Sequence, residues 1–304
     1  MSVLDRFLEG LPMEAPVIDA HAHLPPRSLF YRMSGVSRWH LPAFGTWEQH
    51  ETYQNLESIV QHMDRTGVNK VLACVNGFER LEEGFECVRR YPGRFLPLVS
   101  FWPGIGKTDE ATTTSPGGRR VPDSPQGLRA VLEKVYAAGW RGIKMWDPRA
   151  PEPLSWLYEG VMGFAHENRL VVLHHSWGPP DVLDRMAERF PGALLLMGHA
   201  LDNQKSFDAY QPVLRRRANV FASTTNIRFP GALEGLVKTM GADRVVMGSD
   251  FILHTLEFAV ANIAYARIPD EAKRRIFGKN LKEALERLGH WDKWGYPQPG
   301  RSSN

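Results

Sequence analysis

Two histidines separated by one residue, His21 and His23, end an apolar run near the start of the chain. If that run forms a β-strand, both side chains point to the same side, with their bases about 7 Å apart. This spacing allows two imidazoles to bind one metal ion, although two histidines in a loop are often only polar surface. The pair needs further donors before it indicates a metal site.

Such donors follow three later apolar runs. His174 ends one run, His199 ends the next, and Asp250 follows the last. Imidazole nitrogens and carboxylate oxygens are the ligands that zinc and similar divalent ions take. Each residue alone has an ordinary explanation, since a buried histidine can bond to the backbone and an aspartate after Gly-Ser can form a turn. Their shared position at the ends of apolar runs favours one metal site.

These runs belong to an alternation that extends along the chain. Eight short apolar runs alternate with stretches of helical spacing. Runs such as VVL, ALLLM and RVVM are continuously apolar, which is typical of parallel strands buried on both faces. The pattern predicts an α/β fold, a (β/α)8 TIM barrel with extra C-terminal helices. In such barrels the carboxyl ends of the strands share one face, and active sites lie there.

The expected elements are defined by these runs. The expected strands are 17–22, 69–75, 95–101, 140–146, 170–174, 193–199, 219–224 and 244–250. The expected helices are 46–66, 80–91, 126–138, 155–168, 180–190, 202–217, 231–240 and 256–266, with further helix over 269–288. Two irregular stretches, 25–42 and 102–125, would emerge at the carboxyl-end face. Residues 1–304 are expected to form one barrel domain, with 1–15 as an N-terminal leader and 295–304 as an irregular tail.

Composition excludes several classes of protein. The 304 residues include 37 Lys and Arg against 34 Asp and Glu, and the formal net charge is +3. That charge predicts neither nucleic acid nor an anionic membrane as a partner, so a small-molecule substrate is expected. Cys74 and Cys87 form no metal or redox motif, and no 18-residue apolar run occurs. A cytoplasmic location is therefore expected.

The sequence resembles the amidohydrolase superfamily, in particular the amidohydrolase-related (amidohydrolase 2) branch of metal-dependent hydrolases and decarboxylases. The motifs that carry the resemblance span nearly the whole chain: IDAHAHL, GIKMW, LVVLHHS, LLLMGHA, RVVMGSDF and IFGKNLKEAL. The resemblance implies one divalent metal ion, with zinc expected first and manganese, iron or cobalt as alternatives. It also makes a homodimer an unsurprising assembly.

The resemblance implies a role for each candidate residue. The implied metal ligands are His21, His23, His174 and Asp250. Adjacent strand residues face opposite ways, so only one of His174 and His175 can point inward, and the match of His174 and Ser176 to the family pattern favours His174. His199 would polarise the substrate or carry a proton beside the metal. Asp250 would accept a proton from water while it binds the ion.

Residues near the strand ends are candidates for substrate binding. Some superfamily members carboxylate a fourth-strand lysine to bridge two ions, but the branch that this chain resembles usually holds one. We therefore expect Lys144 to form an ion pair or to face the substrate. The other candidate contacts, whose tryptophans are equally explained by packing, are Trp102, Trp146, Trp177, Asn203 and Arg228.

The ligand set leaves more than one function open. The expected activity is hydrolysis of a small amide, lactone or ester by metal-activated water. The alternative at the same site is non-oxidative decarboxylation of an aromatic or muconate-type carboxylate. A third class is a non-catalytic binding protein that the metal stabilises. A TatD-type nuclease is disfavoured, because GIKMW stands where such nucleases carry Glu-x-Gly-Leu-Asp and because the net charge is small.

Overall fold

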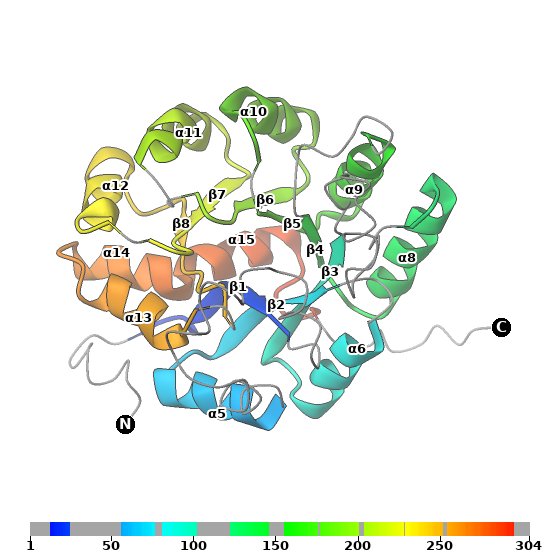
Figure 1. Ribbon diagram of the computed structural model, residues 1–304, viewed down its shortest axis with the longest axis horizontal. Helices are drawn as coiled ribbons and strands as arrows, with labels where there is room; N and C mark the ends of the chain where they lie inside the picture. Colours follow the sequence, from blue (N-terminus) through cyan, green and yellow to red (C-terminus); the bar gives the residue numbers. More distant parts are fainter. Residues whose placement is uncertain are drawn as a thin grey trace, which may run out of the picture.

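The computed structural model describes residues 13–24, 56–76, 81–101, 122–145, 155–175, 177–200, 204–227, 229–251 and 254–294. Its strands are β1 (Ile18–His23), β2 (Lys70–Asn76), β3 (Phe95–Phe101), β4 (Gly142–Met145), β5 (Val171–His174), β6 (Leu194–Met197), β7 (Val220–Ser223) and β8 (Val245–Val246). They form one parallel sheet in the order β1 to β8, with helices around the outside (Figure 1). This confirms the predicted (β/α)8 barrel.

The helices follow the expected alternation with the strands. They are α5 (Leu56–Thr66), α6 (Leu81–Arg90), α8 (Pro125–Ala137), α9 (Ser155–Asn168), α10 (Pro180–Arg189), α11 (Gln204–Arg216), α12 (Ala232–Met240), α13 (Leu256–Ala264), α14 (Asp270–Arg274) and α15 (Asn280–Leu288). A π-helical segment, η4 (Arg275–Lys279), joins the last two. Local capping explains several starts, since the side chain of Thr255 accepts a hydrogen bond from the backbone N–H of Phe258 at the start of α13.

Alternation along the strands divides the core into two clusters. One set of side chains fills the barrel, including Leu72, Leu98, Leu173, Leu196 and Phe221, and α15 closes one end of it with Leu281 and Leu285. The other set packs between the strands and the surrounding helices, including Ile143, Val172 and Leu195. Membership of a cluster therefore tells which face of its strand a side chain occupies.

A β-bulge in β1 changes this alternation next to the first two histidines. Pairing with β2 shifts between Asp19 and Ala22, which indicates one extra residue in β1. Ala20 belongs to the inner cluster and Ala22 to the outer one. The bulge therefore turns His21 and His23 toward the inside of the barrel.

The barrel closes between β1 and the segment that follows β8, which we call the seam. The backbone N–H of Ala20 donates to Met247 O at 2.8 Å, and that of Asp250 donates to His21 O at 2.7 Å. The backbone N–H of His23 donates to Phe251 O. Gly248 leaves room for side chains from β7, because a Cβ at that position would collide with Ser223 Oγ. β8 is consequently shorter than expected, since the chain beyond Val246 turns toward β1.

Some sequence-based expectations fall outside the described residues. These include residues 46–55 of the first expected helix (46–66), most of the leader 1–15, the whole tail 295–304, and all or nearly all of the stretches 25–42 and 102–125. Cys74 and Cys87 are both buried, and they do not form a disulfide. Among the described helices, none combines the length and apolar character needed to cross a lipid bilayer.

Candidate metal centre

Four of the predicted site residues meet at the carboxyl ends of the strands. Nε2 of His21 lies 3.3 Å, and Nε2 of His23 3.0 Å, from Oδ1 of Asp250. Nε2 of His199 lies 3.7 Å from Oδ2 of the same carboxylate. Potential ligand atoms of His21, His199 and Asp250 all lie within 4.8 Å of one another. Residues from β1, the loop after β6 and the seam therefore converge on one point.

His174 does not join this group. Leu173 belongs to the inner cluster, so the next side chain on β5 faces the outer side of the barrel. The ring of His174 lies 4.7 Å from that of Trp177 and stacks at 5.9 Å on that of Tyr158. This placement corrects the expectation that His174 points inward, because the inner face of β5 runs through Val171 and Leu173.

His175 is the histidine of this pair that reaches the site. Its ring centroid lies 4.2 Å from that of His199. Burial, followed by the positive charges of Lys144 and His199, lowers the pKa of His175 to about 2. The imidazole is therefore neutral, which is the state that a metal ligand requires. Because inward side chains recur at every second residue, the residue that follows Leu173 on the inner face is also His175.

Lys144 approaches the centre from β4. Its Nζ lies 2.9 Å from Nε2 of His21, and the side chain is fully buried. Burial lowers the pKa of Lys144. Burial and then the charge of Lys144 lower the pKa of His21 well below its usual range. The structure thus brings this predicted residue to the group of donors, with its amino group beside the imidazole of His21.

Cys74 is a neighbour of the site that no metal or redox motif in the sequence indicates. Its Sγ lies within 4.8 Å of ligand atoms of both His21 and His23. Burial raises the pKa of the Cys74 thiol to about 12, so the group is protonated and a poor metal ligand as it stands. Leu72 and Cys74 are two residues apart on β2 and both belong to the inner cluster, so the alternation of this strand predicts that Cys74 faces inward.

A buried carboxylate, Asp19, links the two sides of the seam beneath the histidines. Asp19 Oδ1 accepts hydrogen bonds from the backbone N–H groups of His21 and Ser249, each at 3.0 Å. Its Oδ2 accepts a further bond from Ser249 Oγ. On the other side of His21, Thr225 Oγ1 lies 3.3 Å from Nδ1. The contact of Thr225 with the ring nitrogen is of the kind that fixes the orientation of a metal-binding histidine, whereas Asp19 holds the backbone.

Asp250 supplies the negative charge of the site. Burial alone raises the pKa of Asp250, but the imidazoles of His21 and His23 outweigh burial and hold the pKa well below its usual range. Both Asp250 and His199 have backbone φ values in the left-handed region, 63° and 53°. Such conformations are uncommon for residues other than glycine and cluster at functional sites.

The chemistry of these donors fits a divalent metal ion. The site offers the neutral imidazoles of His21 and His175 and the ionised carboxylate of Asp250, and this is the ligand chemistry of zinc, manganese, iron and cobalt. Neutral imidazoles do not repel a divalent cation, and the single carboxylate attracts it.

The predicted substrate contacts have mixed outcomes. Trp177 is 3% exposed, and its Nε1 donates to Leu196 O at 3.2 Å, so it packs within the outer cluster and does not line the site. This placement favours the packing explanation that the sequence left open for this tryptophan. The remaining candidates, Trp102, Trp146, Asn203 and Arg228, lie outside the described residues.

Comparison with known proteins gives one family. The amidohydrolase family profile matches residues 109–285 of the chain. No curated protein matches the sequence.

Solved structures share the barrel at low sequence identity. An uncharacterised TIM-barrel protein from Bordetella bronchiseptica has 18% identity and a TM-score of 0.67, covering 90% of this chain and 99% of that chain. The 5-carboxyvanillate decarboxylase from Sphingomonas paucimobilis has 15% identity and a TM-score of 0.63, with 90% and 99% covered. The same enzyme from Novosphingobium aromaticivorans, complexed with manganese and 4-hydroxy-3-methoxy-5-nitrobenzoic acid, has 14% identity and a TM-score of 0.60, with 90% and 96% covered. These likenesses establish the fold alone.

Proposed function

The chain belongs to the amidohydrolase family, and from that premise we propose that it is a metal-dependent decarboxylase of a small aromatic carboxylate. The observation that carries the proposal is the group of buried imidazoles around Asp250 at the carboxyl ends of the strands. Two solved structures with the same fold are named as decarboxylases, and one of them holds manganese and a nitrobenzoic acid. We therefore prefer decarboxylation to the hydrolysis expected first from the sequence.

The proposed metal ligands are His21, His23, His175 and Asp250. When bound there, a divalent ion supplies a positive charge that orients an anionic substrate oxygen and stabilises negative charge during the reaction. The manganese in the Novosphingobium aromaticivorans enzyme favours that metal, while the same donors suit zinc, iron or cobalt.

Lys144 and His199 are the proposed substrate-handling residues. The buried amino group of Lys144, which lies 2.9 Å from Nε2 of His21, is the proposed contact for an anionic substrate group. His199 lies beside Asp250 and is the proposed proton donor. In the proposed reaction the bond from the ring carbon to the carboxylate breaks, and its electron pair stays on the ring carbon. Carbon dioxide leaves, and the ring carbon takes the proton that His199 delivers.

Hydrolysis of an amide, lactone or ester is the second candidate. The description of the matched family favours it. In that reaction Asp250 would accept a proton from the attacking water, and His199 would protonate the leaving group. Both groups lie at the same point of the barrel, with 3.7 Å between His199 Nε2 and Asp250 Oδ2.

One experiment separates these functions. The purified protein is analysed for bound metals, loaded with manganese, and incubated with hydroxylated benzoates and with a panel of amides, lactones and esters. We expect release of carbon dioxide and an aromatic product that carries one deuterium at the vacated carbon when the solvent is heavy water. Incorporation of labelled oxygen from water without carbon dioxide would establish the hydrolase. Full metal retention without turnover on either panel would favour the non-catalytic class.

A further inference from the structure

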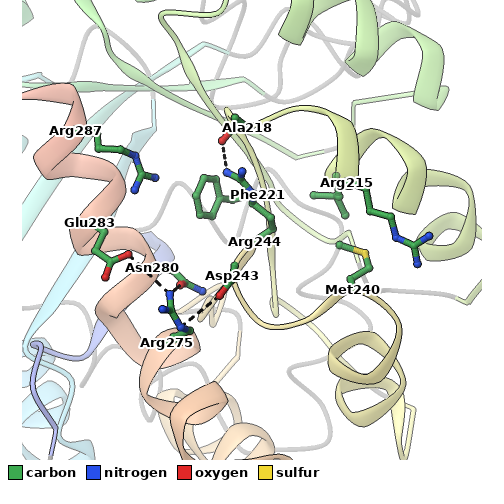
Figure 2. Close-up of a pocket in the computed structure, with 11 residues that line it drawn as sticks. Arg215, Ala218, Phe221, Met240, Asp243, Arg244, Arg275, Asn280, Glu283 and Arg287 are labelled. Atoms are coloured by element: carbon green, nitrogen blue, oxygen red, sulfur yellow. Dashed lines mark hydrogen bonds and ion pairs between the residues drawn. The ribbon is translucent and has the colours of Figure 1, made fainter.

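A second cavity lies at the amino-terminal end of the barrel, at the opposite end of the strands from the candidate metal centre. It has a volume of about 550 Å³, which lies within the range of small-molecule sites. Its walls come from the end of α11, the starts of β7 and β8, the end of α12, and α15 (Figure 2). We call it the basal pocket.

Charge is unevenly compensated in the basal pocket. Four arginines line it, together with only two acidic residues, Asp243 and Glu283. Arg275 takes up both acids, at 3.3 Å from Asp243 and 3.9 Å from Glu283. A second arginine, Arg215, extends away from the cavity and donates to Thr239 O at 2.8 Å (Figure 2). The other two arginines, Arg244 and Arg287, are therefore the candidates for binding an anion in the pocket.

Arg244 and Arg287 direct their guanidinium groups into the same space. Figure 2 shows both side chains extending toward the ring of Phe221, Arg244 from the start of β8 and Arg287 from α15. The guanidinium of Arg244 lies 5.2 Å from the centroid of that ring and donates to Ala218 O. Within the described ranges, neither group has a carboxylate at ion-pair distance. Two positive charges therefore share this space without an ion pair to a described carboxylate, although the charge of Asp243 still acts on Arg244.

An anion would relieve this arrangement. Burial lowers the pKa of Arg244, the charge of Arg287 acts in the same direction, and the charge of Asp243 opposes them. Guanidinium groups match the oxygens of carboxylates and phosphates with paired hydrogen bonds. Phe221 and Met240 add apolar surface to the walls. We propose that the basal pocket binds a small organic oxyanion between Arg244 and Arg287, with its apolar part against Phe221.

Titration calorimetry on the metal-loaded protein tests this site with two probes, phenyl phosphate and benzoate, which distinguish a phosphoryl from a carboxylate ligand. We expect at least one probe to bind, and Arg287→Gln and Arg244→Gln each to weaken that binding by about tenfold or more, as loss of a charge-assisted hydrogen bond predicts. Arg287 is exposed, so its variant is expected to fold even if the Arg244 variant does not.

Arg216→Gln provides the matched control. Arg216 lies on α11 beside the pocket, but its guanidinium pairs with Asp184 at 2.6 Å and does not line the cavity. Its variant removes one positive charge and should leave the affinity for either probe unchanged. A probe held only at the metal centre keeps its affinity in Arg287→Gln and Arg244→Gln. That result, or the absence of binding by both probes, overturns the proposal.

Discussion

His174 and His175 are neighbours in sequence but lie in opposite environments. The ring of His174 packs against the rings of Trp177 and Tyr158 outside the barrel. The ring of His175 lies beside His199, near the carboxylate of Asp250. One imidazole therefore contributes mainly to packing, whereas the other is available to a metal ion.

Alanine variants of the two histidines should fail in different ways. We expect His175→Ala to lose bound metal and to reduce activity by more than about 100-fold, beyond the usual effect of a residue that only orients a ligand. We expect His174→Ala to retain metal but to lose about 2 kcal/mol or more of unfolding free energy, because a buried ring leaves a cavity. Elemental analysis and urea denaturation measure the two effects. The reverse pattern would restore His174 as the ligand.

The sequence predicted most of this group because each member ends an apolar run. His21, His23, His199 and Asp250 are all recognisable in that way. The choice of His175 depends on which face of β5 points inward, and the sequence pattern there, VVLHH, is apolar on both faces. Cys74 was set aside because its approach to His21 and His23 results from packing between β1 and β2, which no local motif records.

At the scale of elements, Asp19 holds β1 to the segment after β8. Its carboxylate accepts bonds from the backbone of His21 and from both the backbone and the hydroxyl of Ser249. His21 is itself a proposed metal ligand, and Ser249 directly precedes another, Asp250, on the other side of the seam. Asp19 is therefore a positioning residue for the metal centre.

Asp19→Asn tests that positioning role. One carboxylate oxygen is replaced by an amide NH₂, which cannot accept the bond from Ser249, so we expect metal affinity to fall by about 10- to 100-fold. The unfolding free energy should fall by about 1–3 kcal/mol. Ser249→Ala removes only the hydroxyl donor and should show a smaller loss of metal affinity in the same direction. Unchanged metal affinity in both variants would show that Asp19 serves stability alone.

Helices α5 and α13 meet next to the seam through an ionic group. Glu257 on α13 lies 3.0 Å from Nε2 of His62 and accepts a bond from Arg65 at 2.9 Å. The ring of His62 stacks at 5.3 Å on that of Phe251, which follows Asp250. Burial raises the pKa of Glu257, but the bonds from His62 and Arg65 outweigh it and lower the pKa to about 2.

This lowered pKa predicts a defined loss of stability in acid. The ionised form of Glu257 stabilises the fold above its ordinary pKa of 4.5, and the contribution disappears as the pH falls toward about 2. Because the side chain is partly exposed, we expect roughly 1–2 kcal/mol at pH 7. Glu257→Gln should lose this contribution at neutral pH and approach the wild type near pH 2. Urea denaturation across that range measures it, and a difference that does not depend on pH would contradict the assigned charge effect.

At the scale of the whole molecule, the barrel was predictable and its closure was not. Parallel strands buried on both faces leave continuous apolar runs, and eight of these alternate with helical spacing. The end of β8 gives no such signal, because the chain after Val246 bonds to β1 through Met247, Asp250 and Phe251 instead of continuing a regular strand pair. The bulge in β1 is equally invisible in the apolar pattern.

The proposed ligands lie on both sides of this closure, so the metal should stabilise the seam more than the rest of the barrel. His21 and His23 belong to β1 and Asp250 follows β8, whereas β3 pairs with regular strands on both sides. A ligand that binds only the folded state adds about 2.7 kcal/mol when its free concentration is 100 times Kd. Removal of metal by a chelator should therefore lower Tm and speed amide hydrogen exchange.

The location of that faster exchange tests the assignment. We expect the backbone N–H groups of Ala20, His23 and Asp250, which bond across the seam, to lose protection on chelation, while the β3 amides change less. Asp250→Asn with manganese added should exchange at the seam like the chelated wild type, because the anionic ligand is absent. Equal loss of protection in β3 and at the seam would mean that the metal stabilises the barrel globally and does not cross-link its closure.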